Sequence, residues 1–394
     1  MPNSQLLRVS RTTPTRRIGL LSTYPPKLCG LATFAAALER ELARAGHRVD
    51  IVRIDDGHDV PAIQRPVAGE LVNGVPASVR DAAGVLSRCD VAIIQHEYGI
   101  YGGADGDEVI DLLNLLEVPT IVILHTVLLE PSPHQRAVLE EIGELTDRVV
   151  VMTEAARDRL IALYAIEESK VVTIPHGASL PALERWKEVD DRAVERPQLL
   201  TWGLLGPGKG IEHAIDALAL LGNVGRRPRY TVAGVTHPKV FARDGDQYRN
   251  SLIQRSWAIG VAGSVTFDDA YRDVAQLTRF IASASIVVLP YDSRDQVTSG
   301  VLVDAIAAGR PVVATAFPHA VELLSSGAGI VVPHADPVAL ADAIRSIVSS
   351  DGEVLASMSA EARRLAPSLS WSVVAEQYAR LSTEIVRAGE PVAF

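Results

Sequence analysis

Two glycine-containing segments of the sequence carry residue patterns that suit the binding of a phosphate group. In "GLLGPGKGIEHAIDAL", Gly203 and a glycine-rich turn precede Lys209, which stands at the start of a helical pattern. In "SGVLVDAIAAGRPVVAT", Ser299 and Gly300 open a second helical pattern after an apolar run. Free N–H groups and the helix dipole favour an anion at a helix start, and a lysine adds a full positive charge.

A third segment, "TYPPKLCGLATF", places Gly30 before the first long helical pattern. Taken alone, this segment fits a tight strand–helix turn as well as it fits an anion site. Three such helix starts around one site predict a ligand with two phosphate groups. Asp304 lies one turn inside the helix that Gly300 opens and cannot bind phosphate by charge, so we expect it to accept hydrogen bonds from ribose hydroxyls.

Polar residues follow two further apolar runs. His96, Glu97 and Tyr98 precede a loop with three glycines, a composition that suits recognition of sugar hydroxyls. His125 ends the run "VPTIVILHTV", where it could bind a substrate hydroxyl or take part in acid–base steps. The structural alternatives are that His96 and Glu97 satisfy each other and the backbone, and that His125 is a core histidine. For His176, at the junction of the two halves, we expect a hinge role.

The segment with Lys209 also matches the phosphate loop of nucleotide hydrolases, G-x-x-x-x-G-K, through Gly203 and Gly208. The next residue is Gly210, where that motif needs a serine or threonine to hold Mg²⁺. An ATPase that releases phosphate from ATP with Mg²⁺ is therefore the weaker interpretation of this segment.

The composition is that of an ordinary globular protein, with 47% hydrophobic and 22% charged residues. A length of 394 residues predicts two domains. The net charge of −10 and the 5% of aromatic residues argue against nucleic acid as a partner. Two cysteines form neither a disulfide framework nor a metal cluster, and they suit a reducing cytoplasm.

No apolar run in the sequence reaches the roughly 18 residues that a membrane span requires. The opening stretch "MPNSQLLRVSRTTPTRR" has four arginines and no acid, and it lacks the apolar core of a signal peptide. We interpret residues 1–16 as a disordered basic arm. The prediction is a cytoplasmic protein with at most peripheral contact with the inner face of a membrane.

Short apolar runs alternate with helical patterns along nearly the whole chain. Six runs between Ile18 and Pro175 predict strands, and six more follow a polar, proline-containing segment. Runs that are apolar on both faces are typical of buried parallel strands. The pattern predicts an α/β protein with two Rossmann-like, doubly wound domains, residues 17–185 and 196–368, that face each other across a ligand-binding cleft. The last helix, in residues 369–394, is expected to cross back to the first domain.

These motifs resemble those of the retaining glycosyltransferase family 4, also called group 1, which has the GT-B architecture. The resemblance covers nearly the whole chain. Its most specific parts are "GLLGPGKGIEHAIDAL", similar to G-R-L-x-x-x-K-G, and "SGVLVDAIAAGRPVVAT", similar to G-x-x-x-x-E-A-M-A-x-G-x-P-V-V. The segments "QHEYGIYGG" and "LHTVLLEPSPHQR" resemble a bacterial, mannosyltransferase-like branch.

The resemblance implies roles for individual residues. Lys209 would clamp the donor diphosphate, and His125 would meet the transferred sugar. The donor-binding residues implied are Gly30, Gly203, Lys209, Ser299, Gly300, Val301, Leu302 and Asp304. The catalytic residues implied are His125, Lys209 and Gln296, and the acceptor is expected at His96, Glu97 and Tyr98.

Two residues depart from the family pattern. Gln296 stands where the family has the first glutamate of its two-carboxylate motif, and Asp295 beside it could substitute. Leu204 stands where the family has an arginine, which removes one positive charge near the diphosphate, and Arg294 is a candidate replacement. These departures keep a non-catalytic sugar-nucleotide binder open as an alternative.

The function predicted is transfer of a mannosyl or glucosyl group from GDP-mannose or UDP-glucose to a hydroxyl of a glycan, a lipid-linked acceptor or a metabolite. No metal and no other cofactor is expected, and no residue is predicted to ligate a metal. A sugar-nucleotide epimerase of the same architecture, which needs no acceptor, is the other alternative.

Overall fold

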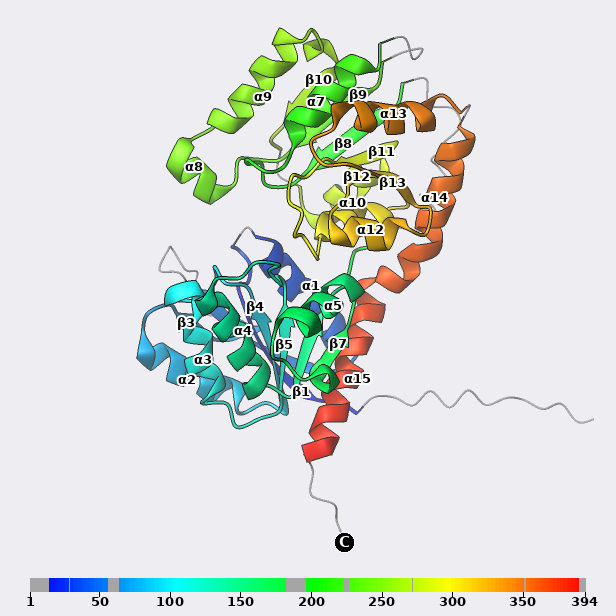
Figure 1. The fold of residues 1–394 in the computed structure, drawn as a ribbon. Coiled ribbons are helices and arrows are strands. Elements are labelled where there is room, and N and C mark those ends of the chain that lie inside the picture. The colour runs from blue at the N-terminus through cyan, green and yellow to red at the C-terminus, as the bar shows by residue number, and fades with distance from the viewer. Residues whose placement is uncertain are drawn as a thin grey trace, which may run out of the picture.

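The computed structural model describes residues 14–27, 29–55, 64–181, 196–222, 227–270, 272–350 and 352–389. These residues form two domains, each a parallel sheet with helices on both faces (Figure 1). This is the predicted α/β architecture with two doubly wound sheets. The predicted basic arm lies outside the described residues except for its last three positions, and residues 182–195 between the two halves also lie outside them.

The first sheet has seven parallel strands in the order β3-β2-β1-β4-β5-β6-β7. The strands are β1 (Arg17–Ser22), β2 (Arg48–Asp55), β3 (Val67–Val72), β4 (Val91–His96), β5 (Thr120–Leu124), β6 (Arg148–Val151) and β7 (Val171–Thr173). The helices are α1 (Gly30–Arg44), α2 (Pro76–Leu86), η1 (Ala104–Gly106), α3 (Glu108–Leu113), α4 (Pro133–Leu145), α5 (Glu154–Leu163) and η2 (Glu168–Lys170). The six strands predicted in this half all form, whereas the sequence analysis missed the edge strand β3.

The second sheet has six parallel strands in the order β10-β9-β8-β11-β12-β13, and all six were predicted. The strands are β8 (Gln198–Trp202), β9 (Arg229–Ala233), β10 (Val265–Asp268), β11 (Ile286–Leu289), β12 (Val312–Thr315) and β13 (Gly329–Val332). The helices are α7 (Ile211–Leu220), α8 (Pro238–Asp244), α9 (Gln247–Ala258), η3 (Ala262–Ser264), α10 (Val274–Ala282), α11 (Gly300–Ala307), α12 (Pro318–Leu324), α13 (Pro337–Val348), α14 (Glu353–Leu365), η4 (Ala366–Leu369) and α15 (Trp371–Gly389).

The strands are buried on both faces because alternate side chains enter two separate apolar clusters. On β4, Ile94 packs into the cluster with α2, α3 and α4, while Ile93 packs into the cluster with α1 and α15. On β5, Val122 and Ile123 divide in the same way. This two-sided burial explains why the strands read as continuous apolar runs, and it directs polar residues to the strand ends.

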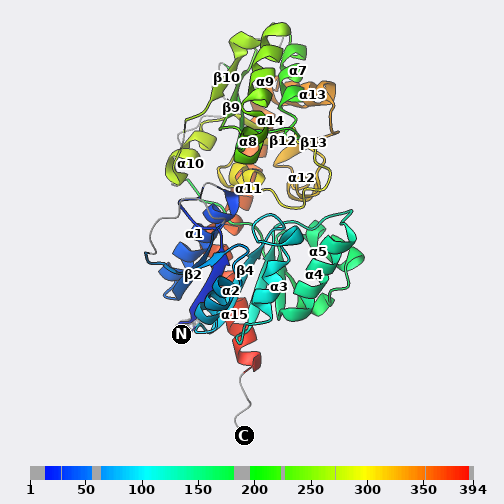
Figure 2. The same cartoon turned by 90° about the vertical axis from the view of Figure 1, so that its left-hand side faces the viewer.

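Helix α15 joins the two domains, because it leaves the second domain and packs against α1 of the first (Figures 1 and 2). Its first residue, Trp371, is 7% exposed and stacks edge-on with Phe34, at 4.8 Å between ring centres. A Cβ at Gly177 would lie 2.3 Å from the Trp371 ring, so only glycine fits there. Among the described residues, no helix has the length and apolar character needed to cross a membrane.

Candidate active site

The first turn of α11 presents N–H groups that lack partners. Two of the four expected amides are already used: the N–H of Ser299 donates to Nδ1 of His319 at 2.8 Å, and the N–H of Leu302 donates to Oγ of Ser299 at 3.3 Å. The N–H groups of Gly300 and Val301 have no acceptor inside the helix, and no hydrogen bond within the described part of the chain uses them. The amides of Ser299 and Leu302 are thus used within the protein, whereas those of Gly300 and Val301 are available to a ligand, and the donor-binding role of all four stays a prediction.

His176 lies directly against this helix start. A Cβ at Gly300 would be 2.9 Å from Nε2 of His176, so a side chain at Gly300 would displace the imidazole. The Nδ1 atom of His176 lies 2.7 Å from the carbonyl oxygen of Gly177 and donates to it, which leaves Nε2 as an acceptor. Burial lowers the pKa of His176 to about 4, so the ring is neutral at physiological pH. The sequence analysis assigned this residue to a hinge and missed its contact with α11.

Lys209 and Ser299 contact the same aromatic ring. The Lys209 Nζ atom lies 4.6 Å from the centre of the Tyr291 ring, and the Tyr291 hydroxyl is hydrogen-bonded to the side chain of Ser299. Burial lowers the pKa of Lys209, and no carboxylate of a described residue forms an ion pair with it. A desolvated ammonium group without a carboxylate partner beside free helix N–H groups is suited to an anionic ligand.

The glycine-rich loop before α7 owes its shape to left-handed backbone positions. Gly203 has φ +125° and Gly210 has φ +61°. A Cβ at Gly210 would lie 1.8 Å from the carbonyl oxygen of Pro290, which no side chain could tolerate. The fold therefore requires glycine where the phosphate loop of nucleotide hydrolases places its Mg²⁺-binding serine or threonine. This geometry argues against the ATPase interpretation.

Asp304 lies on α11 without a partner of its own. No hydrogen bond or ion pair joins its carboxylate to another residue in the described ranges. Burial raises the pKa of Asp304 from 3.8 to about 7. A carboxylate with such a pKa and unused acceptor atoms is available to a ligand.

The raised pKa of Asp304 predicts a stability cost that depends on pH. The folded state holds the proton between pH 3.8 and about 7, where the unfolded state releases it, so this group lowers stability as pH rises through that window. A shift of about three units corresponds to about 4 kcal/mol, and we expect about half of this for a half-buried side chain. Asp304→Asn should therefore raise the free energy of unfolding by about 2 kcal/mol at pH 8 and leave it unchanged at pH 4, as measured by urea titration. An equal effect at both pH values would contradict this assignment.

On the first domain, His125 lies beside the same histidine that touches α11. The Phe34 ring centre is 5.1 Å from both the His125 and the His176 rings. Burial, together with the neighbouring His176 and His96, lowers the pKa of His125 to about 3, and its buried Nε2 atom has no hydrogen-bond partner in the structure. His125 is therefore neutral at physiological pH and is suited to hydrogen bonding rather than to donating a proton as an acid.

The three residues predicted at the acceptor lie at the end of β4. His96 is fully buried, both of its ring nitrogens lack a partner, and burial lowers its pKa to about 4. Glu97 accepts the hydroxyl of Thr126 at 2.5 Å and the N–H of Tyr98 at 3.1 Å. Of the structural alternative, only the bond between Glu97 and the backbone is observed, because no hydrogen bond joins His96 to Glu97 among the described residues.

Gly30 and Gln296 occupy different kinds of position. Gly30 is the first residue of α1, and a Cβ there would meet no atom within 4 Å, which leaves room beside the helix start. The Gln296 side chain instead donates to the carbonyl of Thr298 at 3.1 Å, so its amide N–H is used inside its own loop.

The loop that leads to α11 is held by the first domain. Thr153 donates its hydroxyl to the carbonyl of Val297 at 2.9 Å. Arg159 donates to the carbonyl of Asp295 at 2.8 Å. The carboxylate of Glu322 on α12 accepts the first N–H groups of α5, at 3.1 and 2.9 Å. These contacts involve residues far apart in the sequence, and no sequence pattern indicated them.

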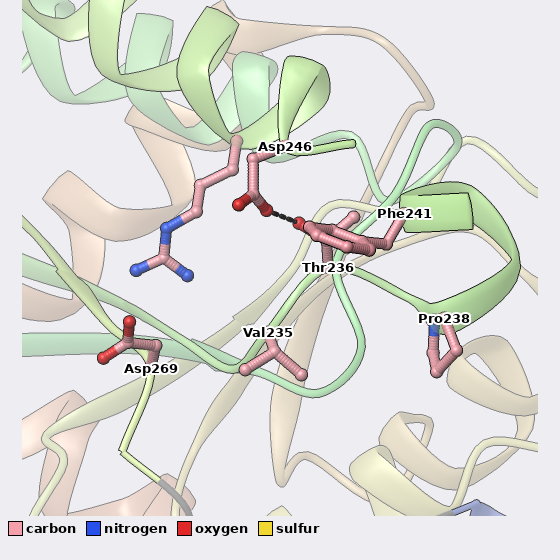
Figure 3. Close-up of a pocket in the computed structure, with 7 residues that line it drawn as sticks. Val235, Thr236, Pro238, Phe241, Asp246 and Asp269 are labelled. Atoms are coloured by element: carbon pink, nitrogen blue, oxygen red, sulfur yellow. Dashed lines mark hydrogen bonds between the residues drawn. The ribbon is translucent and has the colours of Figure 1, made fainter. Parts of the chain in front are cut away.

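A cavity of about 360 Å³, lined by both apolar and charged side chains, lies next to the glycine-rich loop, and no sequence pattern indicated it (Figure 3). The N–H of Leu205 in that loop donates to the carbonyl of Val235 at 2.8 Å. Inside the cavity, Asp246 accepts the hydroxyl of Thr236 (Figure 3). Its lining residues are Val235, Thr236, Pro238, Phe241, Asp246, Arg249 and Asp269.

One group of three side chains has the spacing of metal ligands within the described ranges. The ligand atoms of Glu212, His213 and Asp292 lie within 4.8 Å of one another. Glu212 also accepts the hydroxyl of Tyr248 at 2.8 Å, which uses one of its oxygens. The sequence analysis predicted no metal ligand, and the titration with EDTA proposed below tests that prediction.

Comparison with known proteins gives matches over both domains. The family model "Glycosyltransferase Family 4" matches residues 29–180, and "Glycosyl transferases group 1" matches residues 196–350. A curated relative, the D-inositol 3-phosphate glycosyltransferase of Jonesia denitrificans, is 26% identical over 91% of this chain and 93% of its own length.

Two solved structures resemble the whole molecule. The Anabaena protein HepE, in complex with UDP and glucose, has a TM-score of 0.74 at 17% identity, over 94% of this chain and 100% of its own. The sucrose-phosphate synthase of Thermosynechococcus elongatus has a TM-score of 0.73 at 19% identity, over 95% of this chain and 100% of its own. The likeness confirms the predicted GT-B fold. The chain belongs to the family 4, or group 1, glycosyltransferases, and it is a transferase enzyme.

Proposed function

We propose that this glycosyltransferase moves a mannosyl or glucosyl group, with retention of the anomeric configuration, from a nucleoside diphosphate sugar to an acceptor hydroxyl. One observation carries the proposal: Lys209, a buried lysine without a carboxylate partner, contacts the ring of Tyr291, which also bonds Ser299 at the start of the helix with the free N–H groups. Three fixed positive or partly positive groups at one place suit a diphosphate. Asp304, one turn further along α11, would accept the ribose hydroxyls.

In this proposal the protein acts chiefly on the leaving group. Lys209 and the two N–H groups would stabilise the charge that develops on the diphosphate as the glycosidic bond breaks. His125 and His176 have pKa values of about 3 and 4 because of burial, so neither is a strong base. A diphosphate oxygen would therefore take the proton of the acceptor hydroxyl. Because that oxygen lies on the face that the leaving group departs from, this step favours retention.

Two sugar nucleotides, UDP-glucose and GDP-mannose, are candidates for the donor. The solved structure of HepE contains UDP and glucose, which favours UDP-glucose. The resemblance of "QHEYGIYGG" to a mannosyltransferase-like branch favours GDP-mannose. Calorimetric titration with GDP, UDP and ADP, followed by their sugar conjugates, separates these candidates directly.

The titration also tests whether binding depends on a metal. We expect one nucleoside diphosphate to bind with an affinity that changes by less than about threefold between EDTA and Mg²⁺, because protein N–H groups and Lys209 supply the positive charge. As a control, His213→Ala removes one potential metal ligand and should leave the affinity unchanged. Binding that requires Mg²⁺, or binding of ATP alone, would contradict the proposal.

A non-catalytic sugar-nucleotide binder is the second candidate, because Gln296 offers an amide where the family has a carboxylate and this amide is already used by Thr298. Such a protein would bind the donor but release no nucleoside diphosphate, with or without acceptors. Measurement of nucleoside diphosphate release after the binding titration distinguishes the two functions.

A further inference from the structure

The part of the first domain where we expect the acceptor to bind belongs to a segment without any lysine or arginine. Residues 89–135 span 47 positions and contain none of either type. They include the end of β4, the end of β5 and the loop that follows each strand. The same segment contains eight acidic residues, which are Asp90, Glu97, Asp105, Asp107, Glu108, Asp111, Glu117 and Glu130.

Glu97 brings this negative charge to the site itself. It follows the last residue of β4, and one of its carboxylate oxygens accepts the hydroxyl of Thr126, the residue next to His125. The other oxygen accepts the N–H of Tyr98. Burial raises the pKa of Glu97, while the two donors, one to each oxygen, lower it and favour the ionised carboxylate. No lysine or arginine in the described residues forms an ion pair with it, although Lys239 on α8 lies near enough to act on its charge.

The other nearby cations are occupied by the protein. Arg136, the first arginine after the segment, lies over the Tyr164 ring and donates to the carbonyl of Leu163. Arg159 uses one guanidinium nitrogen for two carbonyl oxygens, each at 2.8 Å. Both guanidinium groups thus use N–H donors for backbone carbonyl groups of the protein.

His96 provides a second, independent sign of a ligand. Its ring is fully buried, both ring nitrogens lack a partner, and its centre lies 5.1 Å from the centre of the Tyr98 ring. A buried imidazole without hydrogen bonds has one unmet donor and one unmet acceptor. A hydroxyl group can both accept a hydrogen bond from the ring N–H and donate one to the other ring nitrogen. The neutral imidazole carries no positive charge that would attract an anion.

We infer that the acceptor of this enzyme is a polyhydroxylated molecule without phosphate or carboxylate groups, and that Glu97 excludes anionic acceptors. The inference rests on the proposed function and on the predicted position of the acceptor at His96, Glu97 and Tyr98. Like charges at close range in a partly buried site repel strongly, so an ionised Glu97 selects against an anion. The curated relatives named for inositol 3-phosphate would then differ from this chain in the charge of their acceptor.

The test compares matched acceptor pairs in the presence of the donor that binds in the titration. The pairs are myo-inositol with its 3-phosphate, glucose with glucose 6-phosphate, and mannose with mannose 6-phosphate. We expect at least one unphosphorylated member to accelerate nucleoside diphosphate release, with kcat/KM at least about 10-fold above that of its phosphorylated partner.

Two variants connect this preference with Glu97. Glu97→Gln keeps an acceptor for Thr126 but removes the charge, so the preference should fall by at least about fivefold while the affinity for the donor stays unchanged. Glu117→Gln removes an exposed charge of the same segment, before β5, and should leave the preference as in the wild type.

Three results would overturn the inference: a phosphorylated member that is the better acceptor in any pair, acceleration by no member, or a preference that Glu97→Gln leaves intact. Failure of the proposed function is a separate outcome, because it appears earlier, as absence of donor binding.

Discussion

Replacing Lys209 by alanine lowers turnover by a factor of about 10² or more, which is the range for loss of one preorganised electrostatic donor. The expectation rests on the position of this lysine. Its ammonium group lies over the Tyr291 ring, burial lowers its pKa, and it has no carboxylate partner among the described residues. Steady-state measurement of nucleoside diphosphate release gives the result, with kcat and KM determined separately.

A matched variant separates charge from packing at this position. Lys209→Met retains most of the aliphatic stem over Tyr291 but has no charge. It should lose nearly as much activity as Lys209→Ala if the charge stabilises the leaving group. A rate near that of the wild type for either variant would contradict the role assigned to Lys209.

The replacement of Trp371 by alanine should destabilise the protein by about 3–5 kcal/mol, the usual range for truncation of a large buried aromatic side chain. Trp371 is 7% exposed, stacks on Phe34 and fits against Gly177, where no Cβ could be accommodated. Its loss leaves a cavity where α15 meets the first domain. Denaturant titration, monitored by circular dichroism, measures the change in the free energy of unfolding.

Trp257 offers a control on the same molecule, because its side chain is 73% exposed. Trp257→Phe should change the free energy of unfolding by no more than about 0.5 kcal/mol. If Trp371→Ala costs less than about 1 kcal/mol, α15 contributes little to the first domain, and the account of its packing is wrong.

Most strands could be predicted because two-sided burial leaves a signature in the sequence. The run that contains Ile93 and Ile94 is apolar at every position that faces either cluster. The edge strand β3 has no such signature, since it contains Gly69 and Glu70 and only two of its six residues are buried. It forms because it pairs in parallel with β2, with one register shift between Ile51 and Val52, and that pairing is a tertiary interaction.

The candidate site was predictable where the ligand-facing feature is local. A glycine at a helix start and a lysine after a glycine-rich turn can be read from consecutive residues, as with Gly300 and Lys209. The contact between the N–H of Ser299 and His319 joins positions 20 residues apart, and the pattern around either residue gives no sign of it. The contact of His176 with the start of α11 could not be predicted for the same reason, because its neighbour Gly300 comes from the other domain.

The loop before α11 is attached to both domains, because it is part of the second domain and is hydrogen-bonded to the first. Thr153 and Arg159 hold its carbonyl groups from one side, while the loop continues into the α11 N–H groups on the other. Any rotation that separates the domains must either break these bonds or pull the loop, and both change the place of Gly300. A ligand held by the N–H groups of Gly300 and Val301 would therefore be bound more or less strongly according to the angle between the domains.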